Sequence, residues 1–114
     1  MKRLGVNIDH VATIRNARGE YHPSPLNAAK FVNRNGAHSV TIHLREDRRH
    51  INDYDAKKIC SIKGLLVNLE ISTNSEIVKK ALKIKPDYIC LVPENRNEIT
   101  TEGGLNLMKN KKKN

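Results

Sequence analysis

A chain of 114 residues is long enough for one domain, which would bury roughly 65% of its unfolded surface. Hydrophobic residues make up 38% of the chain and no run reaches the roughly 18 apolar residues of a membrane-spanning helix, which excludes an integral helical membrane protein. The net charge of +9 favours a polyanionic partner or phosphorylated ligands.

The excess positive charge is concentrated at the carboxyl end. Four lysines fall within the final sequence KNKKKN, so we expect a domain over residues 1–107 and a disordered, lysine-rich tail over residues 108–114. Cys60 and Cys90 lie far apart and in no metal-binding spacing, which predicts reduced thiols. The first ten residues do not have the pattern of a signal peptide, and together these features predict a cytoplasmic protein.

Four apolar runs rich in Val, Ile and Leu are predicted to be strands. They are LGVNI (4–8), SVTIHL (39–44), LLVNLEI (65–71) and YICLV (88–92). They show little alternation, as expected of parallel strands that are covered on both faces. Because aromatic residues make up only 4% of the chain, the core must be aliphatic. The sequence DHVATIRNARG, after the first strand, is interpreted as a long basic loop.

Three helices are predicted between these strands. The first has Ser24 as its expected N-cap and Pro25 at its first position. The second begins near Asn52 or Asp53, and the third opens with a capping-box pattern in TNSE (73–76). The resulting order β-α-β-α-β-α-β predicts an α/β fold with a parallel sheet.

Polar side chains gather where each predicted strand ends. They are Asn7, Asp9 and His10 after the first strand, His43 and Arg45 after the second, Asn68 and Glu70 in the third, and Glu94 after the fourth. In parallel α/β folds this edge of the sheet binds ligands and carries the chemistry. The highly charged stretch HLREDRRH (43–50) is therefore interpreted as the rim of an active site.

Among parallel folds, the sequence favours a (β/α)₈ (TIM) barrel. No G-x-G-x-x-G turn follows the first strand, and the chain has no G-x-x-x-x-G-K-[ST] phosphate loop. Such a barrel needs roughly 250 residues, so this chain would supply its N-terminal half, about four βα units. Two unpaired sheet edges and an aliphatic inner face would remain uncovered, and we expect the half-barrel alone to be unstable or to self-associate.

Four motifs follow one another along the chain: GVNIDHVATIRNARG (5–19), VTIHLREDRRHI (40–51), NLE (68–70) and LVPENRNEITTEGGL (91–105). Together they resemble the pyridoxine 5′-phosphate synthase family, in register from about residue 4 to residue 106. The resemblance implies a cytosolic TIM barrel that assembles into homo-oligomers. It also implies an enzyme of vitamin B6 biosynthesis that condenses 3-amino-2-oxopropyl phosphate with 1-deoxy-D-xylulose 5-phosphate, giving pyridoxine 5′-phosphate, phosphate and water without a metal or organic cofactor.

The same resemblance implies roles for nine residues. His43 and Glu70 would move protons during Schiff-base formation, dehydration and ring closure. The residues implied to bind substrate are Asn7 and Arg18 for the amino-ketone phosphate, and Asp9, His10, Arg45, His50 and Thr100 for the deoxyxylulose phosphate. These residue types suit the chemistry, because guanidinium groups bind phosphate and an imidazole with a carboxylate can shuttle protons near neutral pH. For Arg48 and Arg49, a role in the site and a solvated or interface position are both left open.

The sequence departs from the family pattern at its end, where NLMKNKKKN replaces everything after the fourth strand. In the family, the later strands supply a catalytic histidine and glycine-rich phosphate loops. The sequence therefore leaves open an active enzyme subunit and a truncated, inactive half-barrel. A small basic nucleic-acid-binding protein is a third reading, disfavoured because one Phe and three Tyr offer little surface for base stacking. No membrane or nucleic-acid partner is expected.

Overall fold

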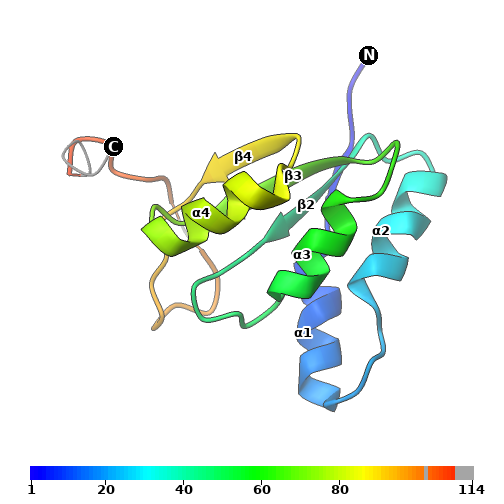
Figure 1. Cartoon of the computed structure of the whole chain (residues 1–114), viewed down its shortest axis with the longest axis horizontal. Helices are drawn as coiled ribbons and strands as arrows, with labels where there is room; N and C mark the ends of the chain where they lie inside the picture. Colours follow the sequence, from blue (N-terminus) through cyan, green and yellow to red (C-terminus); the bar gives the residue numbers. More distant parts are fainter. Residues whose placement is uncertain (102, 110–114) are drawn as a thin grey trace.

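The computed structural model describes residues 1–101 and 103–109. Its elements are β1 (Gly5–Asn7), α1 (Asp9–Arg18), α2 (Pro25–Arg34), β2 (Ser39–His43), α3 (Asp53–Cys60), β3 (Leu66–Ile71), α4 (Ser75–Ile84) and β4 (Tyr88–Leu91). The four strands form one parallel sheet in the order β1-β2-β3-β4, as predicted (Figure 1). No helix within the described ranges has the length and apolarity to cross a bilayer.

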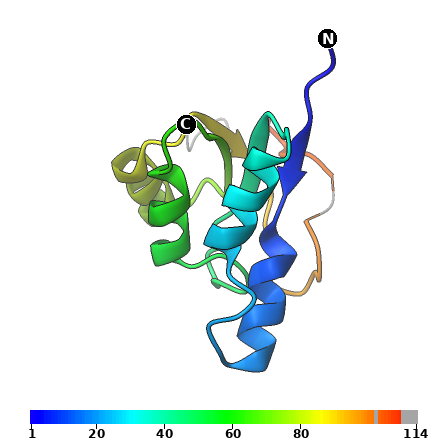
Figure 2. The same ribbon diagram turned by 90° about the vertical axis from the view of Figure 1, so that its right-hand side faces the viewer.

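Over the described ranges, the helices that pack along the sheet lie on one of its faces. In Figures 1 and 2, α2, α3 and α4 lie along the same side of the strands. In β3, Val67, Leu69 and Ile71 are buried, whereas the intervening Asn68 and Glu70 are half-buried and, by the strand alternation, lie on the other face. The expected poor alternation was therefore wrong for this strand. The inner face that was expected to be aliphatic carries polar side chains at its centre.

The core lies between the sheet and the helices, and it is aliphatic as expected. Its buried members are Ala, Ile, Leu and Val side chains, among them Val40, Ile42 and Leu69 at 0% exposure. Burying one such side chain stabilises a fold by roughly 1.5–3 kcal/mol. The core therefore holds β2 and β3 rigidly, and with them the polar residues at their carboxyl ends.

Residues 9–18, which the sequence analysis interpreted as a loop, form helix α1. Its N-cap Ile8 makes no side-chain cap and only Asp9 and Ala12 are buried, although the helix has an acidic residue in its first turn and basic residues in its last turn. Tertiary contacts hold it in place instead. Arg15 pairs with Asp55 of α3 through two bonds of 2.7 and 2.9 Å. Gly19, with φ of +66°, ends the helix in the left-handed conformation that glycine adopts most readily.

The caps of two later helices match the predictions and that of α4 does not. Ser24 caps α2 through its bond from Asn27 N–H, and Asn52 caps α3. The expected capping box at residues 73–76 is wrong, because the N-cap of α4 is Asn74, whose Oδ1 accepts from two backbone N–H groups. The capping box lies at α3 instead, where Asn52 and Asp55 bond each other's backbone N–H.

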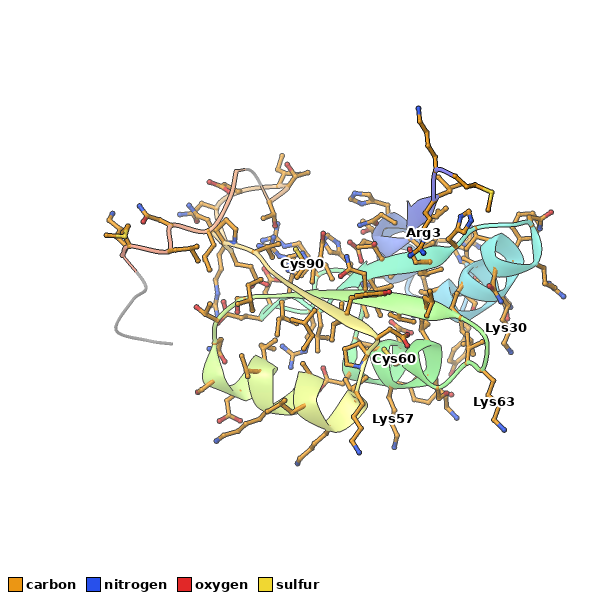
Figure 3. All side chains as sticks on the ribbon, turned by 90° about the horizontal axis from the view of Figure 1, so that it is seen from above. Arg3, Lys30, Lys57, Cys60, Lys63 and Cys90 are labelled. Carbon is orange, nitrogen blue, oxygen red and sulfur yellow. The ribbon has the colours of Figure 1, made fainter. Side chains whose placement is uncertain are left out.

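Strand β4 is one of the two edges of the sheet and is exposed along its whole length. All four of its residues are exposed, including Ile89 at 46% and Leu91 at 43%. Figure 3 views the sheet from its edge, with Cys60 on the helix-covered side and Cys90 on the other side. Both cysteines are free thiols, as predicted. Of the predicted tail, residues 110–114 lie outside the described residues; Met108 and Lys109 belong to a turn whose N–H groups donate to Asn106.

Candidate functional site

The polar ends of the strands meet at one edge of the sheet. The parallel register pairs Asn7 with Thr41 and His43 with Glu70, so residues on neighbouring strands stand side by side. The predicted convergence of Asn7, His43 and Glu70 at one edge is thus confirmed. One ligand-type atom each from Asp9, His43 and Glu70 lies within 4.8 Å of the others.

Asp9 links the ends of β1 and β2. It is the first residue of α1, where the helix dipole favours a negative charge, and it is 5% exposed. Its Oδ2 accepts a hydrogen bond from Asn7 Nδ2 at 2.9 Å, and its Oδ1 accepts one from the backbone N–H of His43 at 2.7 Å. Asn7 Oδ1 in turn accepts from Asp9 N–H at 2.8 Å. This network fixes the backbone of His43 against strand β1.

His43 lies between two carboxylates. Its side chain is 4% exposed, with Nε2 2.8 Å from Glu94 Oε1 and Nδ1 3.8 Å from Glu70 Oε2. Burial and the nearby Asp9 raise the pKa of Glu70, although the charge of His43 opposes the shift. Burial also acts to raise the pKa of Glu94, but hydrogen bonds from His43 and from the Glu46 backbone, together with the charges of His43 and Arg45, outweigh it and lower that pKa. Two carboxylates with oppositely shifted pKa values beside one imidazole suit proton transfer.

A second group of residues extends the site along α1. Thr13 Oγ1 lies 3.0 Å from His50 Nδ1 and 3.4 Å from His10 Nδ1, and the two imidazole rings are 5.5 Å apart. Burial lowers the pKa of His50, and the positive charges of His10, Arg45 and His43 lower it further, against the raising effect of Asp9. His50 therefore favours its neutral form, in which it donates or accepts a hydrogen bond.

The arginines of the stretch 43–50 hold the loop that follows β4. Arg45 is 1% exposed and donates to the carbonyl of Asn95 at 3.2 Å and to Thr101 Oγ1 at 3.3 Å. Arg49 donates to the carbonyls of Arg96, Glu98 and Ile99. Between the two guanidinium groups, Asp47 has its pKa lowered to about 2: burial acts to raise it, but bonds from Arg49 and the positive charges prevail.

The structure adds detail to what was expected of two arginines and a threonine. Arg48 and Arg49 are both partly exposed; Arg48 pairs with Asp53 at 2.6 Å, and Arg49 donates to a carbonyl of the loop after β4. In this structure the threonine that contacts Arg45 is Thr101, whereas Thr100 is exposed. Short-range sequence pattern cannot choose between adjacent threonines, because the choice depends on how the loop folds back over β2.

Arg18 lies apart from this cluster. It is the last residue of α1, about 13 Å along the helix axis from Asp9 at 1.5 Å per residue. Its side chain is 56% exposed and pairs with Glu20 at 3.2 Å. The structure thus brings together Asn7, Asp9, His43, Glu70 and Arg45, with His10 and His50 beside them, and leaves Arg18 and Thr100 outside.

The described residues contain one group with the spacing of metal ligands, namely Asp9, His43 and Glu70. Both oxygens of Asp9 already accept hydrogen bonds, and His43 Nε2 is bonded to Glu94. Each Asp9 oxygen keeps a further lone pair, so the three residues still offer three ligand atoms, with His43 contributing Nδ1. Their existing hydrogen bonds already orient Asp9 and His43 without a cation.

Sequence reasoning missed Glu94 as a member of the site. It was noted as a polar residue after the fourth strand and was given no role. In the structure it is 5% exposed and contacts His43 and the backbone of Glu46. The signal available was its place directly after Pro93, at the carboxyl end of a strand, where each of the other strands contributed a candidate.

The family model for the pyridoxal phosphate biosynthesis protein PdxJ matches residues 4–114. The chain belongs to this family. It is 68% identical over 113 residues to a pyridoxine 5′-phosphate synthase of Pelagibacter ubique, covering 99% of this chain and 47% of the relative. Enzymes of the same name from Aliivibrio fischeri and Photobacterium profundum are 56% and 54% identical over 104 residues, covering 91% of this chain and 43% of each relative.

The chain spans about half the length of the curated relatives it matches. The chain folds as a parallel sheet of four consecutive strands with helices on one face, and it matches the family from residue 4 onward. It is the N-terminal half of a (β/α)₈ barrel. The relatives are enzymes by name, and that name supports the predicted link to vitamin B6 biosynthesis.

Proposed function

We propose that this chain carries one half of a pyridoxine 5′-phosphate synthase site. The reaction is the condensation of 3-amino-2-oxopropyl phosphate with 1-deoxy-D-xylulose 5-phosphate, in which His43 and Glu70 move protons. The observation that carries the proposal is the pair itself: a buried imidazole beside a carboxyl group whose pKa is raised, at the carboxyl edge of a parallel sheet. A raised pKa lets a carboxyl group give and take protons near neutral pH.

The substrate-binding part of the proposal rests on cationic and polar groups around that pair. Asn7 would bind the amino-ketone phosphate, and so would Arg18, which lies apart from Asn7 at the far end of α1 in this structure. Arg45 and His50, with Asp9, His10 and Thr100, would bind the deoxyxylulose phosphate. Arg45 supports this role because it is a buried guanidinium beside the proton-transfer groups, and guanidinium forks bind phosphate with two hydrogen bonds. No metal or organic cofactor is part of the proposed reaction.

The second half of the barrel completes the proposed site. The exposed apolar residues of β4 are a surface that further parts of a barrel would cover. We propose that the complete enzyme is a cytoplasmic homo-oligomer and that this chain by itself has little activity. Losing one positioned acid or base costs about 10²–10⁴-fold in rate, and losing substrate positioning adds to that.

Complementation tests this proposal. The chain would be co-expressed with the part of the Pelagibacter ubique relative that lies beyond the matched region. Pyridoxine 5′-phosphate should form from the two substrates only when both halves are present, and His43→Ala should abolish it. Turnover by this chain alone, lost in His43→Ala, would contradict the incomplete-site argument. Absence of product from a soluble, folded complex of both halves would contradict the assigned reaction.

The role of Arg45 can be tested by calorimetry. Titration of the complemented protein with 1-deoxy-D-xylulose 5-phosphate should show salt-sensitive binding that Arg45→Ala weakens by at least about tenfold, because a charge-assisted hydrogen bond contributes roughly 1.5–3 kcal/mol. Arg34→Ala is the matched control, since it removes the same charge from an exposed position at the end of α2. Equal affinities for the two variants would remove Arg45 from the site.

A further inference from the structure

Glu94 makes two directed contacts that together fix its carboxylate. Oε1 lies 2.8 Å from His43 Nε2, and Oε2 accepts from the backbone N–H of Glu46 at 3.1 Å. The side chains of Glu94 and His43 are 5% and 4% exposed, so bulk water does not compete for either group. Because the second oxygen is tied to backbone, the carboxylate cannot rotate away from the imidazole without losing a buried hydrogen bond.

These contacts determine which nitrogen of His43 carries the proton. An ionised carboxylate only accepts hydrogen bonds, so the neutral ring must place its proton on Nε2 to satisfy Glu94. The lowered pKa of Glu94 keeps that carboxylate ionised near neutral pH: burial opposes ionisation, but the hydrogen bonds from His43 and the Glu46 backbone outweigh it. Nδ1 is then the unprotonated nitrogen.

The surroundings of Nδ1 leave its lone pair free of a hydrogen bond to Glu70. It lies 3.8 Å from Glu70 Oε2, which is beyond hydrogen-bonding distance, so Glu70 does not occupy its lone pair. Asp9, the third member of the group, uses its oxygens to accept from Asn7 and from the His43 backbone. The lone pair of Nδ1 therefore faces the space that it shares with Glu70.

We propose that Glu94 is the positioning residue of His43, holding the ring in the Nε2–H tautomer so that Nδ1 is the atom that accepts protons. The assignment of the tautomer stands on the contacts and the charge of Glu94, whereas the use of Nδ1 as a base rests on the proposed function. In each transfer a bond from hydrogen to a substrate atom breaks, and its electron pair stays on the substrate. A new Nδ1–H bond forms, and the imidazolium that results faces the negative charge of Glu94 until it returns the proton.

Long-range ¹⁵N–¹H spectra of the chain labelled at histidine nitrogen test the tautomer without any need for activity. At a pH where His43 is neutral, its Nε2 should show the shift of a protonated ring nitrogen and its Nδ1 that of an unprotonated one. His43→Asn assigns the signals. The reverse pattern, with the proton on Nδ1 in the wild-type chain, would overturn the proposal.

Glu94→Gln tests whether Glu94 sets the tautomer of His43 or only packs against its ring. The glutamine amide has nearly the same shape but can donate a hydrogen bond to Nε2, so the variant should move His43 toward the Nδ1–H tautomer. Glu98→Gln is the matched control, because Glu98 is exposed on the same loop, and it should leave the spectrum unchanged. An Nε2–H tautomer that persists in a folded Glu94→Gln chain would show that Glu94 does not set it. Should that variant fail to fold, the wild-type spectrum still decides which nitrogen is protonated.

Kinetics of the complemented enzyme test the use of Nδ1. Glu94→Gln should lower kcat by roughly 10²-fold, the lower end of what a positioned base contributes, with little change in KM. Unchanged kcat with a switched tautomer would refute the role of Nδ1 as the base. If the wild-type complex has no activity, the proposed reaction fails, while the spectra still decide the tautomer.

Discussion

Strands β3 and β4 are neighbours with similar apolar composition and different surroundings. The register pairs Leu69 with Ile89 and Ile71 with Leu91. Leu69 and Ile71 are 0% and 1% exposed, whereas Ile89 and Leu91 are 46% and 43% exposed. The difference arises because α3 and α4 cover β3 and only one side of β4 has a neighbouring strand. Burial is thus a property of a strand's position in the sheet, and apolar composition alone does not guarantee it.

The candidate site follows the same division. His43 and Glu70 lie on the two central strands, whose apolar side chains are buried under the helices. The register between β2 and β3 fixes the positions of the two residues. Glu94 follows the exposed strand β4, and its contact with His43 links the two regions. The candidate pair His43 and Glu70 therefore lies on the covered strands, and Glu94, which we propose orients His43, follows the exposed strand β4.

Leu69→Ala and Ile89→Ala, made one at a time, should show the largest difference in the free energy of unfolding. Leu69→Ala should lower the free energy of unfolding by about 2–5 kcal/mol, because it leaves a cavity in the core. Ile89→Ala should lower it by about 1 kcal/mol or less, because much of this side chain is already in water. Urea unfolding of both variants measures the contrast.

The difference in unfolding free energy between Leu69→Ala and Ile89→Ala should become smaller in the complemented protein. Once further strands cover β4, Ile89→Ala should become more costly and approach the effect of Leu69→Ala. Equal costs for the two substitutions in the isolated chain would mean that β4 is already covered, for example by self-association, and light scattering would detect that state.

Replacing Glu70 with Gln should stabilise the chain at pH 7. The pKa of Glu70 is raised above its ordinary value of 4.5 by burial first, with Asp9 contributing, so the folded state favours the neutral acid and loses stability as the pH rises through the folded pKa. Glu70→Gln should therefore raise the free energy of unfolding by about 0.5–2 kcal/mol at pH 7, a gain usual for relieving a functional site. The gain should vanish below about pH 4, and a loss of stability at pH 7 would contradict the argument.

A smaller effect is expected from His50 in mild acid. Burial, aided by nearby positive charges, lowers its pKa below 6.5, so the unfolded chain binds a proton more readily than the folded chain. The stability that His50 provides is complete above pH 6.5 and declines as the pH falls toward the folded pKa. His50→Asn, which keeps an acceptor near Thr13, should flatten this part of a plot of Tm against pH. Parallel curves for the variant and the wild type would show that His50 does not titrate differently on folding.

Glu94 should contribute to stability over a different pH range from Glu70 and His50. Its folded pKa lies below the ordinary value of 4.5, because the bonds from His43 and Glu46 outweigh the effect of burial. Its contribution to stability is therefore present above pH 4.5 and lost as the pH falls through the folded pKa. Calorimetric scans of Glu94→Gln should depart most from the wild type at neutral pH and converge with it in acid. A difference between the scans that is independent of pH would assign the effect to packing rather than to ionisation.

Local signals in the sequence were sufficient for the strands, for two helix caps and for the gathering of polar residues at one edge. Ser24 and Asn52 each bond an N–H group three residues away, so neighbouring residues alone determine these caps. The carboxyl ends of consecutive parallel strands meet at one edge whatever the details of packing, which is why His43 and Glu70 were expected at the same end of the sheet. The sequence also carried the family motifs, and the match over residues 4–114 confirmed them.

Three features depend on the tertiary structure: the helical conformation of α1, the contact of His43 with Glu94 and the exposure of β4. Helix α1 depends on Arg15 reaching Asp55, 40 positions along the chain, and His43 reaches Glu94 across 51 positions. No local periodicity encodes such pairs, because they depend on the path of the chain between them. Ile89 is as apolar as its buried neighbour Leu69, and it is exposed because burial requires a second layer of protein, which a strand's own residues cannot supply.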